Sequence, residues 1–397
     1  MQPSVGKLGG ALPRTVVVLG LVSLLNDAAS EMITPLLPIF LTVTLGAGPA
    51  IVGFVEGLAE ATASILKLVS GRLADRGVSA KGLVIGGYTL SNLSRPLIGL
   101  ATGWAAVLLL RFLDRVGKGL RTAPRDALIA GAVGSGQRGR AFGFHRAMDH
   151  AGAVIGPLLA FGLLAAQTEL QHVFLASALP GVLVILLLVF GLPAHHHVPP
   201  IAPPQRFKWS ALHLRLRAMI VAAGLLALAS VPEVFVVLWA TQAGMAVTWV
   251  PLVWAAASLA KMLIAMPAGV LSDRLGRLPV LLGGWAARVA VLTLLAFAEP
   301  GALGVWALFI AYSATLAITE PAERSLIGDH ADERERGTAY GLYHLTAGLL
   351  VLPGAVLFGA LWQGLGSPTA FAVAALVTGA AGIVMLGLAR PARRPGG

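Results

Sequence analysis

Runs of about 20 apolar residues recur along the whole of this 397-residue chain, and short polar segments separate them. A run of that length crosses a bilayer as a helix, because only a helix satisfies all backbone N–H and C=O groups within one segment. Hydrophobic residues make up 57% of the chain and the mean hydropathy is +0.82, which is far more apolar surface than a water-soluble fold can cover. The pattern predicts an all-α membrane protein.

The apolar runs predict about twelve transmembrane helices in two groups of six. The first group covers residues 14–43, 50–69, 82–101, 104–131, 141–165 and 171–192, and the second covers 217–241, 248–268, 278–298, 302–327, 339–361 and 369–389. Between them lies a proline-rich segment with a run of three histidines, which predicts a linker. We therefore expect an N-terminal six-helix bundle over 1–192, a cytoplasmic linker over 193–216 and a C-terminal six-helix bundle over 217–397.

One polar loop occurs twice at corresponding places in the two halves. The string Gly71–Gly77 (GRLADRG) returns about 200 residues later as Gly269–Arg277 (GVLSDRLGR). A second pair of loops, 137–141 and 335–339, repeats the same relation with the strings QRGRA and ERGTA. The two predicted bundles are therefore related by an internal repeat.

Both copies of the loop resemble the signature loop of the major facilitator superfamily, which lies between its second and third helices and again between its eighth and ninth. The resemblance covers essentially the whole chain. It implies two six-helix bundles that rock about a central site near the membrane midplane. It also implies a cytoplasmic latch formed by the loop residues Gly71, Asp75, Arg76, Asp273 and Arg274.

Loop charge predicts the orientation in the membrane. The odd-numbered loops, such as 45–49 and 298–302, hold no Lys or Arg, whereas the even-numbered loops and both termini are basic. The positive-inside rule then places both termini in the cytoplasm, for a multi-pass protein of the cell (inner) membrane. The net charge of +11 comes from these flanking loops and forms no single basic face, so we expect no nucleic-acid partner.

The fourth predicted span is crowded with charges, which are costly inside a bilayer and rarely face lipid. Steps of three and four residues place Arg111, Asp114, Arg115 and Lys118 near one helical face. That face must look into a water-filled cavity or onto partner charges. The stretch also resembles the fourth-helix motif of the family, although Arg115 stands where the family usually has a glycine. By that resemblance, Arg111 is assigned to proton coupling.

Carboxylates in the first two spans are the candidate partners and proton carriers. Asp27 and Glu31 are four residues apart, as are Glu56 and Glu60. A buried carboxylate beside an Arg can exchange a proton when its surroundings change between wet and dry, and we prefer Asp27 and Glu31 for this role. The alternative is that these charges form internal salt bridges that only hold helices together.

The fifth predicted span contains Gly143, Gly152 and the pair Gly156-Pro157, which partly match the fifth-helix motif typical of the family's antiporters. That resemblance favours export. His145 and Asp149 share a face and are weak candidates for a divalent metal, although a hydrogen-bonded polar stripe is the simpler interpretation. We therefore predict no metal site.

A set of charged side chains within the spans is predicted to line the substrate cavity. These are Arg95, Asp114, Arg115, Lys118, Arg146, Asp149, Glu233 and Arg288. The basic members suit an anionic or zwitterionic metabolite, but the acidic ones could neutralise them. Anionic or amphipathic organic solutes, drug-like cations and metal ions all stay open as substrates.

The sequence favours a proton-coupled secondary transporter that exports a small organic solute by alternating access. Symport-type uptake of an anionic metabolite or siderophore, and divalent metal export, are the alternatives. No HExxH, GxSxG or Walker-type loop is present, which argues against an enzyme or an ATP-driven pump. A receptor or scaffold with a transporter fold stays open. We expect no cofactor other than the proton gradient, with the solute, protons and the lipid bilayer as partners of a monomer.

Overall fold

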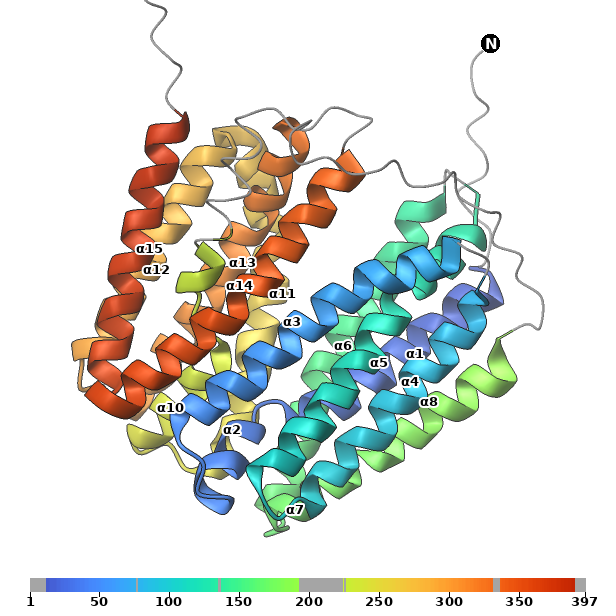
Figure 1. Ribbon diagram of the computed structural model, residues 1–397, viewed down its shortest axis with the longest axis horizontal. Helices are drawn as coiled ribbons and strands as arrows, with labels where there is room; N and C mark the ends of the chain where they lie inside the picture. Colours follow the sequence, from blue (N-terminus) through green and yellow to red (C-terminus); the bar gives the residue numbers. More distant parts are fainter. Residues whose placement is uncertain are drawn as a thin grey trace, which may run out of the picture. The chain divides into compact units, whose positions relative to one another are not determined.

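The computed structural model describes residues 12–75, 78–134, 137–192, 224, 226–330 and 336–389. Every regular element within these ranges is a helix (Figure 1). The chain forms two compact units. Unit 1 comprises Met1–Thr34, Leu66–Ala101 and Ala106–Pro203, and unit 2 comprises Pro35–Ile65, Thr102–Ala105 and Pro204–Gly397.

Unit 1 is built from helices that run beside one another and pack through small residues. Its elements are α1 (Arg14–Ile33), the end of α3 (Pro49–Asp75), α4 (Ala80–Leu97), the 3₁₀ turn η2 (Ile98–Leu100), α5 (Trp104–Gly131), α6 (Arg138–Ala165), α7 (Leu170–Ala176) and α8 (Ala178–Gly191). Helix α1 packs on α6 and α8, and α4 also packs on α8. The predicted span 104–131 coincides with α5.

Unit 2 holds the start of α3 and the helices of the second half of the chain. Its elements are α2 (Leu37–Ile39), the π-helical turn η1 (Phe40–Thr44), α10 (Glu233–Gln242), the 3₁₀ turn η5 (Val247–Trp249), α11 (Val250–Leu275), α12 (Arg277–Phe297), α13 (Ala302–His330), α14 (Arg336–Leu365) and α15 (Ser367–Ala389). Helix α13 packs on α11 and α12, and α15 packs on α12 and α14. All of the predicted linker 193–216 lies outside the described residues, so the predicted division of the chain stays a prediction.

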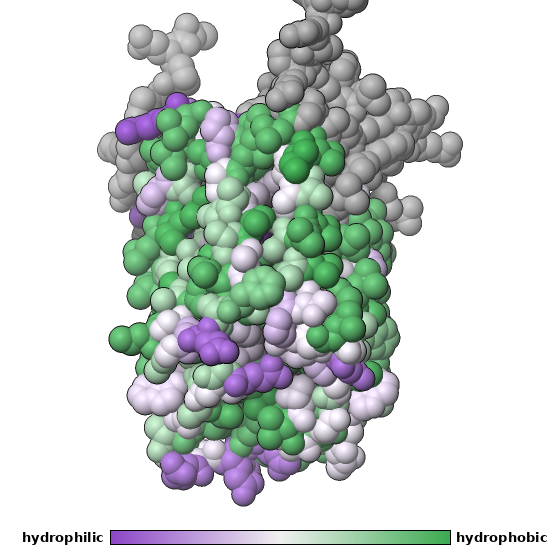
Figure 2. Space-filling view, turned by 90° about the vertical axis from the view of Figure 1, so that its left-hand side faces the viewer, coloured by the Kyte–Doolittle hydropathy of each residue, from purple (hydrophilic) through white to green (hydrophobic). Residues whose placement is uncertain are grey.

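Nine of the described helical segments are long and apolar enough to cross a bilayer. The segments that fall outside this set are α4, α5 and the shorter apolar stretch Leu226–Gln242. An all-helical membrane protein is thereby confirmed, whereas the count of twelve spans is not. Figure 2 shows a face covered mainly by hydrophobic residues, with hydrophilic ones gathered toward its lower part. Such a surface is suited to lipid.

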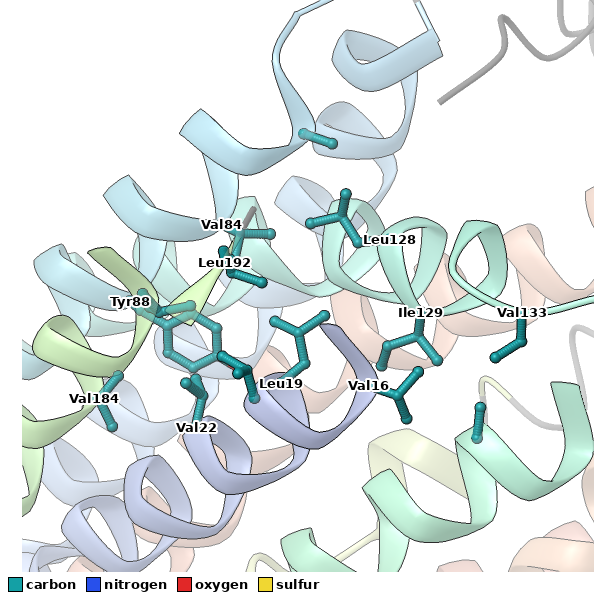
Figure 3. Close-up of a cluster of buried hydrophobic side chains, with 14 residues drawn as sticks. Val16, Leu19, Val22, Val84, Tyr88, Leu128, Ile129, Val133, Val184 and Leu192 are labelled. Carbon is teal, nitrogen blue, oxygen red and sulfur yellow. The ribbon is translucent and has the colours of Figure 1, made fainter. Parts of the chain in front are cut away.

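The apolar core of unit 1 joins five helices, α1, α4, α5, α6 and α8 (Figure 3). Val16, Leu19 and Val22 of α1 meet residues of α4, α5 and α8, among them Tyr88 and Leu128. These side chains are at most 2% exposed. The core therefore fixes α1 against α4 and α5, the two helices that carry most of the buried charge of this unit.

Two predicted spans are interrupted at corresponding places in the repeat. In the first span, α1 ends at Ile33 and α2 begins at Leu37; in the seventh, helix stops before Ser230 and restarts as α10 at Glu233. Pro35 and Pro232 lie in these breaks, and proline cannot donate the backbone hydrogen bond that a continuous helix needs. Interruptions of this kind free backbone polar groups at the depth where transporters bind their solutes.

The second copy of the repeated loop forms a tight turn between α11 and α12. Gly276 adopts a φ of 93°, a conformation that residues with a Cβ rarely reach. Helix α11 ends at Leu275 and α12 begins at Arg277, so a single residue reverses the chain. In the first copy, α3 ends at Asp75 and α4 begins at Ala80.

Glycines allow α1 and α6 to pack backbone against backbone. A Cβ built on Gly152 would lie 2.3 Å from the carbonyl oxygen of Leu24, and one on Gly156 would lie 2.4 Å from that of Ala28. Real Cβ atoms do not approach an oxygen so closely, so only glycine fits at these positions. Small residues allow such close approach in membrane bundles, where lipid supplies no hydrophobic drive between helices.

We expect Gly156→Ala to lower the melting temperature of the detergent-purified protein. The added methyl group must push α1 away from α6, and overpacking of this kind costs about 1–3 kcal/mol. Gly162 is the matched control, because it lies on the same helix with open space around it. Gly162→Ala should leave the melting temperature unchanged or slightly raised, since Ala is the better helix former. Equal melting temperatures for the two variants would contradict the close packing.

Candidate functional site

A buried carboxylate surrounded by three guanidinium groups lies inside unit 1. Asp114 of α5 is 0% exposed. Its Oδ1 accepts a hydrogen bond of 2.8 Å from Nε of Arg95 on α4, and its Oδ2 lies 3.4 Å from Nη1 of Arg111 and 3.5 Å from Nε of Arg115. We call these four residues the Asp114 cluster. The steps of three and four residues correctly predicted that Arg111, Asp114 and Arg115 share a face.

Polar side chains of α1 and α4 hold the Asp114 cluster in place. Nη1 of Arg95 donates to Oδ1 of Asn26 at 3.0 Å and to the Asn26 carbonyl oxygen at 3.2 Å. Asn92 in turn donates to Oδ1 of Asn26 at 3.3 Å. Sequence reasoning sought the partner of Arg111 in the first two spans, whereas the structure provides Asp114 on the same helix. Its members are at most 8% exposed, so the cluster lies inside the unit. The predicted roles of Arg111 in proton coupling and of the other members in the substrate cavity stay predictions.

A second basic group lies one to two turns further along α5. Arg121 is 4% exposed, donates to Oγ of Ser91 at 2.7 Å, and lies 4.3 Å above the ring centroid of Tyr88. Lys118 lies between Arg121 and the cluster along the helix and is partly exposed. Lys118 and Arg121 both interact electrostatically with Asp27 of α1.

Asp27 has the surroundings expected of a group that binds and releases a proton. It is partly exposed, unlike Asp114, and Nδ2 of Asn26 donates to its Oδ1 at 3.0 Å. Its Cβ lies where α6 comes closest to α1, 2.9 Å from a Cβ built on Gly152. Asp149, one turn before Gly152 on α6, is near enough to act on Asp27 electrostatically. We call these two residues the Asp27–Asp149 pair.

Asp149 is held in place by three side chains. Ser23 of α1 donates to its Oδ1. On α6 itself, Nδ1 of His145 and Nη1 of Arg146 lie 3.6 Å and 3.8 Å from its Oδ2. His145 is buried, at 4% exposed, whereas the side chain of Arg146 is 62% exposed. The sequence predicts Asp149 as a cavity residue and as a weak metal ligand with Asp27 or Glu31 nearby, and the structure shows that Asp149 interacts electrostatically with Asp27.

The remaining predicted proton carriers are partly buried. Glu31 lies on α1 near the break in the first span, and Glu56 and Glu60 lie one turn apart on α3. Each has electrostatic or hydrogen-bonding partners. Their roles stay predictions.

In unit 2 the predicted cavity residues Glu233 and Arg288 have different hydrogen-bond partners. Glu233 begins α10 and pairs with Lys261 of α11. Arg288 of α12 is 4% exposed and donates to the carbonyl oxygen of Thr315 and to Oγ1 of Thr319 on α13, at 3.3 Å and 2.8 Å. Lys261 was not among the predicted site residues. A glutamate within the membrane needs a partner on a neighbouring span, and this requirement could have pointed to Lys261.

The predicted latch is only partly described. Asp75 is the last residue of α3, Arg76 lies outside the described residues, and a Cβ on Gly71 would meet Cβ of Ala123 at 3.6 Å. In the second copy, Asp273 bonds to Arg277 four residues further on, at the start of α12. Arg274 lies in the last turn of α11. The role of these residues as a latch stays a prediction.

A metal site and a separate cavity are the other places where a ligand could bind. Within the described part of the chain, no group of three or more His, Asp or Glu residues could hold a metal ion. A cavity of about 490 Å³ in unit 2 lies between the loop after α10 and the loop before α13, and Trp249 and Trp306 form part of its lining. None of the predicted site residues lines it.

Membrane-spanning helices that carry ion pairs, partly exposed carboxylates and two interrupted spans define a polytopic solute transporter. Two stretches of the chain, 19–260 and 234–397, match the family model of the Major Facilitator Superfamily. The chain therefore belongs to this superfamily of secondary transporters.

Known proteins support this assignment. The chain is 30% identical over 362 residues, 89% of either protein, to the uncharacterized MFS-type transporter MJ1317 of Methanocaldococcus jannaschii. It is 34% identical over 164 residues to the multidrug resistance protein MdtH of Photorhabdus laumondii, which covers 41% of this chain and 40% of that one. The crystal structure of the nucleoside transporter NupG superposes with a TM-score of 0.78 over 95% of this chain and 100% of its own, at 14% identity. The last likeness concerns the fold alone.

Proposed function

We propose that this protein exports a small organic solute in exchange for protons, and that it lies in the cytoplasmic membrane with both termini in the cytoplasm. The observation that carries the proposal is the Asp27–Asp149 pair. Two neighbouring carboxylates repel each other when both are ionised, so a pair of this kind is suited to take up and release one proton. Lys118 and Arg121 stabilise the ionised form after the proton leaves.

The placement of the pair connects proton binding to helix movement. Asp27 and Asp149 lie on two helices that pack backbone against backbone, at the glycine contact between α1 and α6. A change in their charge therefore acts directly on that contact. The Asp114 cluster, in contrast, has its charges bound to one another and buried, which suits a fixed support.

Export is supported by two observations. The partial antiporter motif in the fifth span includes Gly152 and Gly156, and both make the backbone contact with α1. The relative MdtH, similar over 41% of the chain, is named a multidrug resistance protein. Uptake of an anionic metabolite or siderophore by symport is the second candidate, because five of the eight predicted cavity residues are basic. Divalent metal export lacks a site among the described residues.

Inside-out membrane vesicles from cells that express the protein provide the test. A pH gradient, acidic inside, is imposed, and uptake of three probes is followed: ethidium, 3-phenylpropionate and L-phenylalanine. Antiport predicts that at least one probe accumulates, and that collapse of the gradient with nigericin releases it. Accumulation that instead requires an alkaline interior would establish symport. Uptake of every probe equal to that of vesicles lacking the protein would contradict the proposal.

The latch gives a separate prediction. Asp75→Ala should reduce transport several-fold while solute binding is largely kept, because the residue acts on the exchange between conformations and not on the solute. Binding is measured as the rise in melting temperature that the same three probes cause, and transport as vesicle uptake. Loss of binding together with transport in a folded variant would show that the latch assignment is wrong.

A further inference from the structure

Unit 2 contains an ion pair that is built differently from the Asp114 cluster. Nζ of Lys261 lies 2.8 Å from Oε2 and 3.0 Å from Oε1 of Glu233, so it contacts both carboxylate oxygens. Oγ of Ser313 on α13 donates to Oε1 of Glu233 at 2.5 Å. Three helices, α10, α11 and α13, therefore meet at this one carboxylate.

The pair lies at the break in the seventh span. Glu233 is the first residue of α10, directly after the non-helical segment Ser230–Pro232. The hydroxyl of Tyr312, which is 0% exposed, donates to the carbonyl oxygen of Val231 and so satisfies a backbone group that the break leaves free. The position of Glu233 is thus fixed by the break, by Ser313 and by the neighbouring Tyr312.

Both charges can be reached from outside the protein, which separates this pair from the Asp114 cluster. The side chains of Lys261 and Glu233 are 30% and 18% exposed, whereas those of Arg95 and Asp114 are 3% and 1% exposed. Ion pairs that serve only to hold helices together gain nothing from such exposure. In an accessible ion pair, each member can exchange its partner for the charge of a ligand.

The exposed side of Lys261 does not face lipid. On α11, Lys261 shares a helical face with the buried Trp254 and Ala268, one to two turns away. The exposed apolar residues of the same helix, among them Leu263 and Met266, lie on the opposite face. A lysine at mid-span is costly against lipid and marks a polar pathway by default.

Lys261 is held from a second side by an aromatic ring. Its Nζ lies 5.8 Å from the ring centroid of Trp254, which packs edge-on against Phe309. A cation at this distance is attracted to the face of the ring. The ammonium group therefore keeps a favourable contact when Glu233 turns to another partner.

We propose that Glu233 and Lys261 bind the two charges of a zwitterionic solute, with its ammonium on Glu233 and its carboxylate on Lys261. A solute of this kind replaces one ion pair with two and leaves the summed charge of Glu233, Lys261 and the solute at zero. A solute with a single charge would contact one member only, so the other, partly buried member would lose the Glu233–Lys261 ion pair without gaining a new one, which is strongly unfavourable. This inference deepens the proposed function, since it names the class of the exported solute.

Binding by the purified full-length protein, measured calorimetrically without any gradient, tests this inference. The probes share one ring and differ in charge: L-phenylalanine is the zwitterion, phenylalaninamide the cation and 3-phenylpropionate the anion. We expect L-phenylalanine to bind at least about tenfold more tightly than either of the others, the ratio that loss of one charged hydrogen bond gives. Tighter binding of a singly charged probe, or no binding of any probe, would overturn the proposal.

Each single substitution should then change which of the three probes binds most tightly. Glu233→Gln leaves Lys261 as the binding charge and should favour 3-phenylpropionate, whereas Lys261→Met should favour phenylalaninamide. The neutral double variant with both substitutions has no unpaired charge, so it should fold even if a single variant does not, and it should lose the preference for the zwitterion. A double variant that keeps that preference would overturn the assignment. Glu299→Gln, at an exposed loop position, is the control that should change nothing.

The outcome for this inference is separate from that for the proposed function. Preference for the zwitterion without proton-driven uptake would leave the binding site standing and contradict proton antiport. Proton-driven uptake of ethidium, with no preference for the zwitterion, would support proton antiport and contradict the zwitterion site.

Discussion

Asp27→Asn is expected to abolish proton-driven transport while solute exchange without a gradient continues. Asn has nearly the same shape as Asp and can still accept the hydrogen bond from Asn26, but it cannot ionise. A site that neither binds nor releases a proton cannot link solute movement to the gradient. Loss of a group that transfers protons commonly costs about 100-fold or more, and we expect a reduction of that size in uptake driven by a pH gradient.

Exchange of labelled for unlabelled solute across vesicles of equal pH serves as the internal comparison. That exchange needs the solute site and the helix movement but no net proton transfer, so Asp27→Asn should keep it. Glu169→Gln is the matched control, because this carboxylate has a side chain that is 75% exposed, in a loop. Gradient-driven uptake by Asp27→Asn at the level of Glu169→Gln would exclude Asp27 as the proton carrier.

Asp114→Asn is expected to remove most of the folded protein from the membrane. The substitution leaves Arg95, Arg111 and Arg115, each at most 8% exposed, without the carboxylate that they share. Breaking a buried ion pair on one side costs about 3–5 kcal/mol, a large part of the roughly 5–15 kcal/mol that stabilises a typical fold. Fluorescence-detected size-exclusion chromatography of a tagged variant measures the folded fraction directly.

Two further variants test whether unpaired buried charge causes the loss of folded protein. Asp126→Asn is the control on the same helix, because its ion pair with Arg125 at 2.9 Å has a carboxylate that is 44% exposed and contributes at most about 1 kcal/mol. Adding Arg95→Gln to Asp114→Asn removes one unpaired charge and should recover part of the folded protein. A variant Asp114→Asn as abundant as Asp126→Asn would show that the cluster does not support the fold.

The helices of this protein follow from simple sequence patterns, and the interruptions within them do not. The predicted span 104–131 coincides with α5, although its charges keep this helix outside the set of apolar segments. The predicted span 14–43, in contrast, contains all of α1, the break after Ile33, all of α2 and most of η1. Hydropathy averages over a window as long as the bilayer is thick, so it does not detect a break of three residues.

The charged residues themselves could be predicted, but their partners only in part. Spacing along one helix correctly grouped Arg111, Asp114 and Arg115, because periodicity describes neighbours within a helix. The pairs that join different helices, Arg95 with Asp114 and Lys261 with Glu233, depend on how the helices pack. No periodicity encodes that packing. The sequence left open whether Asp27 or Glu31 lies near Asp149, and the structure shows the interaction with Asp27.

In the proposed mechanism, protons and solute move in opposite directions through a step that needs Asp27. Proteoliposomes that enclose the pH dye pyranine test this exchange when solute is added outside at equal pH on both sides. Solute entry through the wild-type protein should drive protons out, so the interior becomes alkaline, and Asp27→Asn should show solute entry with no change in pH. Acidification of the interior by the wild type, or the same pH change in both proteins, would contradict the account.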